Sequence, residues 1–236
     1  MMGRVLILLA VALGALAALR DPWRAKVLAQ ATIARIAPPQ PPEPAMTDLP
    51  VPSPIAEAIL AAAERQVGVT LGYDPAYVAI AFPGGDVPSA TGVCSDVVIR
   101  ALREGLGLDL QLAVNRDMKR AFAAYPALWG LTRPDPNIDH RRVPNLETLL
   151  TRAGAALPVS SDADSYLPGD IVSWRLPGNR PHVGLVSRIP MPNGTPMILH
   201  NIGAGARIDD ILFRFEIAGH YRLTEKALAN LGLASR

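Results

Sequence analysis

The sequence predicts an α+β fold in which N-terminal helices, including one that carries the single cysteine, pack on an antiparallel sheet of four to six strands. Apolar residues recur at helical spacing as far as about residue 154, and short β-type runs follow from residue 168. Two of the later runs are separated by Asn193-Gly194, a pair typical of a β-hairpin. Helices that precede strands in this way indicate an α+β architecture.

The helical part is expected to contain four helices. The first begins after Ser53, whose side chain suits an N-cap, and ends at Gly68. Three further apolar patterns predict helices over residues 94–107, 109–125 and 145–154. Glycines close the second and the fourth of these patterns, as expected of helix C-termini.

The strand part contains five short runs rich in Val, Ile and aromatic residues, two of which can belong to one strand. They cover residues 170–175, 182–187, 197–200, 213–217 and 220–223. Thr224 then caps a last short helix.

Composition limits the classes of function. Half of the 236 residues are hydrophobic, which is enough for a real core, and the formal net charge is only +2. A charge balance that small offers no electrostatic case for a nucleic-acid partner. A single cysteine excludes an intramolecular disulfide and a thiolate-rich zinc site.

The N-terminal region predicts export. Residues 1–31 combine a short basic start with an apolar run at 5–19, a length typical of a signal peptide. An uncleaved membrane anchor is the main alternative, because a bilayer can thin around a short segment, and a soluble cytoplasmic helix is the third interpretation. The first two make the protein periplasmic or anchored to the inner membrane facing the periplasm.

Residues 32–54 form a Pro-rich linker, 55–223 the folded domain, and 224–236 a C-terminal helical tail.

Cys94 is expected in the first turn of a buried helix, because Gly92 precedes it and apolar residues follow at helical spacing. There the helix dipole and backbone N–H groups without an intrahelical partner favour the thiolate, the nucleophilic form of cysteine. The same N–H groups can stabilise an oxyanion once a carbonyl is attacked. The alternative is that Cys94 is a small buried hydrophobic residue.

Two of the four histidines lie at the ends of predicted strands: His182 opens one strand and His200 closes a later one. We expect His182 to take the thiol proton and to donate one to a leaving amine, with His200 orienting its ring; Asn201 is the alternative orienting residue. Cys94, His182 and His200 also form a known zinc ligand set. The sequence lacks HExxH and close His-x-His spacing, so neither a metal nor a cofactor is predicted.

These motifs resemble the NlpC/P60 superfamily. The resemblance lies in a cysteine that heads a helix, Gly-Asp-Ile-Val at 169–172, His-Val-Gly-Leu-Val at 182–186, and a histidine at the end of the following strand. It implies a papain-like fold and a cysteine peptidase or amidase that cuts peptidoglycan peptides. It also implies that the catalytic residues are Cys94, His182 and His200, in that order.

The chain resembles the bacterial DUF1287 family of exported proteins more closely still, over about residues 55–223. The matching blocks are residues 73–75, 92–100, 137–145, 200–203 and 219–222. This resemblance implies the fold more directly than the reaction. The chain also departs from the usual Asp-Cys-Ser-Gly of NlpC/P60 enzymes, because Val93 precedes the cysteine and Asp96 replaces the glycine.

Seven residues near these motifs are candidates for substrate binding. Two arginines in the polar loop 139–142 can bind a peptide carboxylate through bidentate contacts. The alternative is a structural loop in which Asp139 pairs with one of them. A tyrosine hydroxyl can lie near the oxyanion, or the ring can simply pack. The candidates are Tyr73, Ser95, Asp96, His140, Arg141, Arg142 and Asn201.

The sequence therefore predicts an exported cysteine hydrolase that acts on an amide bond of a cell-wall peptide, with a Cys-His-His site. The expected partner is a peptidoglycan peptide or another envelope peptide, and no oligomeric state is predicted. The alternative is a catalytically inactive module of the same fold that binds an envelope peptide or protein.

Overall fold

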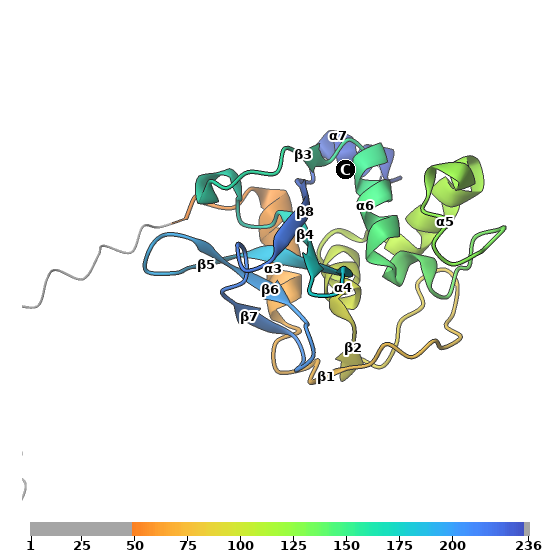
Figure 1. Cartoon of the computed structure of the whole chain (residues 1–236), viewed down its shortest axis with the longest axis horizontal. Helices are drawn as coiled ribbons and strands as arrows, with labels where there is room; N and C mark the ends of the chain where they lie inside the picture. The colour runs from red at the N-terminus through yellow and green to blue at the C-terminus, as the bar shows by residue number, and fades with distance from the viewer. Residues whose placement is uncertain (1–48, 234–236) are drawn as a thin grey trace, which may run out of the picture. The chain divides into compact units, whose positions relative to one another are not determined.

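Six strands form one sheet in the order β3-β8-β4-β5-β6-β7, and every neighbouring pair is antiparallel. The computed structural model describes residues 49–233. The strands are β3 (Ala156–Leu157), β4 (Ile171–Leu176), β5 (Arg180–Pro190), β6 (Pro196–His200), β7 (Arg207–Asp209) and β8 (Glu216–Tyr221). Figure 1 shows this sheet beside the helices α4, α5 and α6.

The helices begin and end close to the predicted positions. They are α3 (Pro54–Glu64), α4 (Cys94–Leu106), α5 (Leu110–Ala121), α6 (Val143–Arg152) and α7 (Glu225–Asn230), with 3₁₀ turns η1 (Phe122–Ala124), η2 (Asp139–Arg141) and η3 (Ala163–Ser165). The side chains of Ser53, Asp109 and Thr224 cap α3, α5 and α7. The predicted α+β class is confirmed.

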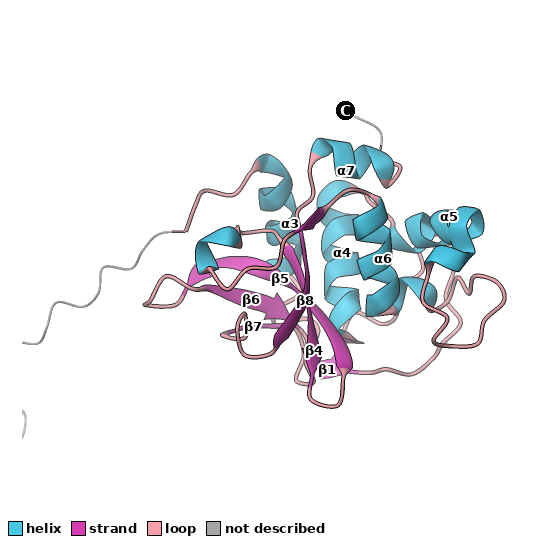
Figure 2. Cartoon of the chain, turned by 45° about the horizontal axis from the view of Figure 1, so that its top comes forward, coloured by secondary structure: helices cyan, strands magenta, loops and turns pink. Residues whose placement is uncertain are grey.

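Helix α4 is the centre of the larger apolar core. Every residue from Cys94 to Leu102 is buried, as expected of a helix covered on all sides. The helix packs against α3 and β5, with the other helices placed around it (Figure 2). Gly105 allows the close approach of α3, because a Cβ at this position would collide with the backbone of Ala58.

A smaller apolar cluster is built around Trp174 of β4. Its members are Tyr166, Val172, Trp174, Val186, Ile198, Ile211 and Leu212. The indole of Trp174 donates a hydrogen bond to the carbonyl oxygen of Leu212 (2.9 Å), so its one polar atom is satisfied in the buried setting.

The runs at 213–217 and 220–223 give the single strand β8, one of the two outcomes that were expected. Two sequence predictions differ from the structure. The short strands β3 and β7 were not predicted, because two or three residues carry no detectable alternation. Helix α6 begins at Val143 rather than after Asn145, whose side-chain amide instead donates to the carbonyl oxygen of Asp139 (3.0 Å).

The predicted signal or anchor at 1–31 lies outside the described residues, as does most of the linker. Within residues 49–233, no helix has the length and apolar character needed to cross a bilayer.

Candidate active site

Cys94 is the first residue of α4, directly after the N-cap residue Val93, and it is 4% exposed. The backbone N–H groups of Val183, Ser95 and Cys94 itself lie close enough to the thiol to lower its pKa. Since Val183 follows His182 on β5, these contacts bring the thiol to the strand end that carries the histidine. The predicted position of Cys94 in the first turn of a buried helix is confirmed.

The expectation that this position favours thiolate is wrong for the structure as it stands. Burial raises the pKa of the Cys94 thiol to about 11, because the charged form loses its hydration. The hydrogen bonds from the three backbone N–H groups lower the pKa, but they do not outweigh the cost of burial. The resting side chain is therefore a neutral thiol at physiological pH.

The two predicted histidines lie together. His182 Nε2 and His200 Nδ1 are 2.9 Å apart, and the rings meet nearly at right angles, with an interplanar angle of 81°. His200 Nε2 lies 3.0 Å from Oδ2 of Asp209 on β7. These contacts extend the predicted pair to a row of three side chains, and they place His200, rather than Asn201, on the ring of His182.

Both imidazoles are neutral in this environment. Burial lowers the pKa of His182 to about 3, and the neighbouring His200 lowers it further. Burial also lowers the pKa of His200, although Asp209 acts in the opposite direction. Residues 49–233 contain no hydrogen bond between the Cys94 sulfur and the His182 ring. Direct proton transfer therefore needs these groups to approach each other, as is common in ligand-free enzymes.

Tyr73 belongs to strand β1 (Gly72–Tyr73), which pairs in parallel with β2 (Thr91–Gly92), the strand shortly before Cys94. Burial raises the pKa of Tyr73 to about 12, with further contributions from the charges of Cys94 and Asp96 and from a hydrogen bond with Cys94. The protonated phenol is thus a hydrogen-bond donor beside the sulfur.

Asp96 and Arg141 form a buried bidentate ion pair below the nucleophile. Arg141 Nε and Nη2 each lie 2.9 Å from a carboxylate oxygen of Asp96, and the two side chains are 3% and 4% exposed. The same carboxylate accepts the N–H of Val93 (2.6 Å), and Ser95 Oγ donates to the carbonyl oxygen of Arg141 (2.7 Å). These polar groups are occupied by one another, so they hold the start of α4 rather than offering free contacts to a ligand.

The rest of the 139–142 loop is also engaged internally. Arg142 pairs with Asp139 (2.9 Å) and its guanidinium lies 4.1 Å from the ring centroid of Trp129. His140 is 2% exposed, and burial lowers its pKa to about 4. The structure therefore matches the alternative in which this loop is structural, with Arg142 as the partner of Asp139.

Asn201 joins the two strands that precede the nucleophile. Its side-chain amide donates to the carbonyl oxygens of Gly72 and Gly92, at 3.0 Å each. The absence of a side chain at Gly92 leaves room for Asp96, since a Cβ there would lie 3.0 Å from the Asp96 carboxylate. Asn201 thus positions Tyr73 and the turn before Cys94.

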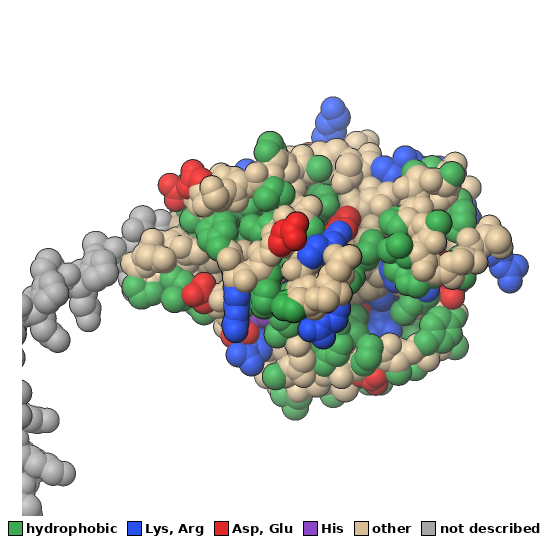
Figure 3. All heavy atoms as spheres, in the orientation of Figure 1, with side chains coloured by type: hydrophobic (Ala, Val, Ile, Leu, Met, Phe, Trp, Pro, Cys, Tyr) green, Lys and Arg blue, Asp and Glu red, His purple; other side chains and the backbone are tan. Residues whose placement is uncertain are grey.

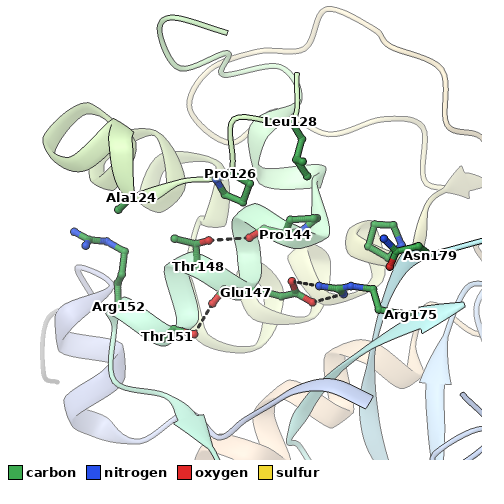
Figure 4. Close-up of a pocket in the computed structure, with 11 residues that line it drawn as sticks. Ala124, Pro126, Leu128, Pro144, Glu147, Thr148, Thr151, Arg152, Arg175 and Asn179 are labelled. Atoms are coloured by element: carbon green, nitrogen blue, oxygen red, sulfur yellow. Dashed lines mark hydrogen bonds and ion pairs between the residues drawn. The ribbon is translucent and has the colours of Figure 1, made fainter. Parts of the chain in front are cut away.

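A groove of about 610 Å³ lies along α6 (Figure 4). Its lining residues are Ala124, Pro126, Leu128, Pro144, Glu147, Thr148, Thr151, Arg152, Arg175, Asn179 and Pro181. Arg175 crosses it to form a bidentate pair with Glu147 (2.7 and 2.8 Å). Pro181 of β5 is among the lining residues, whereas His182 is not.

Asp209 is the site residue that sequence reasoning missed. It lies on a three-residue strand, and only the pairing of β6 with β7 brings it to His200. The sequence holds one weak signal, an acidic residue that follows the candidate histidine by nine positions. Among the described residues, no group of three or more His, Cys, Asp or Glu side chains is arranged to hold a metal ion.

The surface around these elements has mixed chemistry. On the face shown in Figure 3, acidic, basic and apolar side chains are interspersed, and basic side chains do not gather into one broad area.

Comparison with known proteins identifies relatives of this chain. Residues 60–223 match the model of DUF1287, described as a domain of unknown function. A protein from Escherichia coli (strain K12), described as the uncharacterized protein YijF, is 55% identical over 165 residues, or 70% of this chain and 80% of that protein. The structure of NlpC1 from Trichomonas vaginalis is similar with a TM-score of 0.37 and 16% identity, over 75% of this chain and 47% of that one. The chain thus spans about half of the NlpC1 structure.

The Asp96–Arg141 pair gives a stability prediction. Arg141→Met leaves the Asp96 carboxylate buried without its counter-charge, so we expect the free energy of unfolding to fall by about 3–5 kcal/mol. Urea denaturation at pH 7 measures the change. Arg65→Met removes an exposed pair with Glu104 and should cost less than about 1 kcal/mol. Asp96→Asn in the Arg141→Met background should restore part of the loss, and full stability of Arg141→Met alone contradicts the assignment.

The neutral thiol gives a prediction for alkylation. We expect the second-order rate of Cys94 with iodoacetamide to be low at pH 7 and to rise up to about pH 11, because the thiolate fraction follows the raised pKa. The same chain unfolded in urea is the control, and its rate should level off above the ordinary thiol pKa of about 8.5. A folded-state rate that is already at its plateau at pH 7 contradicts the prediction.

Proposed function

Because this chain belongs to the DUF1287 family, which is described as a domain of unknown function, we propose its activity from the site itself: it is a cysteine hydrolase that cleaves an amide bond of a short peptide. The substrate class we propose is a peptide of the bacterial cell wall or envelope. The basic and apolar N-terminal segment supports an exported protein that meets this substrate outside the cytoplasm.

One observation carries the proposal: the only cysteine heads a buried helix and its sulfur lies against the residue next to a hydrogen-bonded histidine pair. A structural cysteine needs no such surroundings. A nucleophile needs a base, a group that orients the base, and donors near the sulfur. Each of these three requirements has a candidate within the described site.

The first half of the reaction forms a thioester. As the Cys94 sulfur attacks the carbonyl carbon of the substrate, its proton passes to the His182 ring and the carbonyl oxygen becomes an oxyanion. The backbone N–H groups of Cys94 and Ser95 and the Tyr73 hydroxyl can donate to that oxyanion. The intermediate then collapses, the C–N bond breaks, and His182 returns the proton to the leaving amine.

The second half releases the product. A water molecule gives a proton to His182 and attacks the thioester carbonyl. Collapse of this intermediate breaks the C–S bond, frees a carboxylic acid, and returns a proton to the Cys94 sulfur. The neutral pair of thiol and imidazole is restored, so no external cofactor is consumed.

The groove along α6 is the proposed binding surface for the peptide. Its volume of about 610 Å³ lies within the range of small-molecule and cofactor sites, about 300–1,000 Å³. Among its lining residues is Pro181, which directly precedes His182 on β5. The Arg175–Glu147 pair and the hydroxyls of Thr148 and Thr151 supply polar groups along its wall (Figure 4).

A second candidate function is a binding module without catalysis. The observation that favours it is the 4% exposure of Cys94 together with the raised pKa of its thiol. In that case the groove still binds an envelope peptide, while the thiol remains inert.

The turnover prediction separates the two functions. With purified peptidoglycan peptides as substrates and the purified full-length chain, we expect wild-type protein to release new amino and carboxyl termini, as detected by mass spectrometry. Cys94→Ser should retain the far-ultraviolet circular dichroism of the wild type and lose turnover completely. His182→Ala should lose at least about 100-fold in kcat, the lower end for general acid–base catalysis. Unchanged turnover in Cys94→Ser removes this residue from the reaction, and binding without turnover by the wild type favours the binding module.

The groove gives a separate prediction. Thr148→Trp fills part of it, so we expect KM for the peptide to rise by about tenfold or more. The rate of Cys94 alkylation should stay unchanged, because a small reagent does not need the groove. Lys226→Trp, which adds the same ring at an exposed position of α7, is the control. An unchanged KM in Thr148→Trp contradicts this use of the groove.

A further inference from the structure

We propose that Asp209 is a positioning residue that fixes the tautomers of His200 and His182 and so makes His182 Nδ1 the proton-accepting atom of the site. The catalytic meaning of this inference rests on the proposed function, whereas the tautomers themselves are a property of the folded chain. Asp209 lies outside the set of residues that the sequence suggested.

The hydrogen bonds that join Asp209, His200 and His182 determine which ring nitrogen of each histidine carries the hydrogen. A neutral imidazole has one N–H and one lone pair, and a carboxylate can only accept. Asp209 Oδ2 lies 3.0 Å from His200 Nε2, so that nitrogen carries the hydrogen. His200 Nδ1 then has the lone pair and accepts from His182 Nε2, 2.9 Å away. The remaining lone pair is on His182 Nδ1.

Asp209 stays ionised, which keeps it an acceptor. Burial raises its pKa, but hydrogen bonds from Arg207 and His200 outweigh burial and hold the pKa below the usual value. Arg207 binds both oxygens, with Nη2 at 2.8 Å from Oδ1 and Nε at 2.6 Å from Oδ2. Arg207 thus keeps the Asp209 carboxylate negatively charged, and this charge orients the hydrogen bonds of His200 and His182.

The strand register puts these groups on one face. His200 of β6 pairs with Arg207 of β7, and Ile198 pairs with Asp209. Residues two apart in a strand point to the same side, so Arg207 and Asp209 lie together beside His200. The contact therefore follows from the sheet itself and not from a mobile loop.

Burial makes the reverse tautomers costly. His200 is fully buried and His182 is 2% exposed, so water has little access to replace a lost partner. If His200 carried its hydrogen on Nδ1, the lone pair on Nε2 would face the Asp209 carboxylate. A buried polar group without its hydrogen bond destabilises the folded state, and more so next to a charge.

The direct test is nuclear magnetic resonance of the full-length chain labelled with ¹⁵N in histidine. Long-range ¹H–¹⁵N correlations at pH 7 report which ring nitrogen carries hydrogen. We expect His182 and His200 both to carry it on Nε2, with single-residue histidine variants supplying the assignments. A wild-type His182 with its hydrogen on Nδ1 overturns the proposal, and this measurement needs no substitution of Asp209.

Variants of Asp209 test the cause. We expect Asp209→Asn and Asp209→Ala to lose the single tautomer of His200, because the acceptor-only group is gone. Asp210→Asn removes the same charge from the next, exposed residue and should leave both tautomers as in the wild type. Wild-type tautomers in a folded Asp209→Ala protein overturn the proposal.

Measurements of turnover test whether the position of the histidines matters for catalysis. We expect kcat of Asp209→Asn to fall by about tenfold or more, the range for a residue that orients a reacting group, and kcat of Asp210→Asn to stay unchanged. The expected tautomers in a chain with no turnover support the positioning role and count against the hydrolase. Turnover with the opposite tautomers supports the hydrolase and overturns the positioning role.

Discussion

The buried ion pair between Asp96 and Arg141 is the interaction on which the site depends. It connects the first turn of α4 to the 139–142 loop, and the same carboxylate accepts the N–H of Val93 just before the nucleophile. Arg141 also donates weakly to the carbonyl oxygens of Ala76 and Asp74, at 3.4 and 3.5 Å. Both charges are satisfied by each other and by backbone groups, which is the condition under which ionised side chains are tolerated in a protein interior. The position of Cys94 is therefore set by electrostatics as much as by apolar packing.

Burial acts on the reacting groups in opposite directions. It raises the pKa of the Cys94 thiol and lowers the pKa of His182, so both effects favour the neutral pair. The reactivity that we propose for this site depends on how its neutral groups are positioned and not on a preformed thiolate–imidazolium pair. In the reaction we propose, charge develops when a substrate carbonyl meets the sulfur, and the backbone N–H groups and the Tyr73 phenol are the proposed donors to that charge. The chemistry we propose is consistent with this resting state, because the proton moves as the bond to carbon forms.

Particular residues show how far sequence reasoning reached. Ser53, Cys94 and Thr224 were correctly predicted at or next to helix starts, because caps, glycine turns and helical spacing are local signals. The pairing of His182 with His200 was also expected, since strand ends that meet in a sheet can bring side chains together. The prediction of a thiolate was wrong, because a pKa depends on hydration, and the burial of Cys94 is decided by parts of the chain far from it in sequence. Substrate-binding arginines were one of two alternatives, and only the fold decides that Arg141 meets Asp96, 45 residues away.

The sequence by itself determined the α+β class, the family, the helix that carries the cysteine and the order Cys94, His182, His200. Periodicity and short motifs predict these features, because both depend on residues that are close together in the sequence. The tertiary structure alone decided that Asp209 completes the histidine row, that Asn201 connects the strands before Cys94, and that α6 borders a groove. Such contacts depend on strand register and on the packing of distant segments. A three-residue strand such as β7 has no pattern of its own, and its place is set by the free energy of the whole sheet rather than by its local preference.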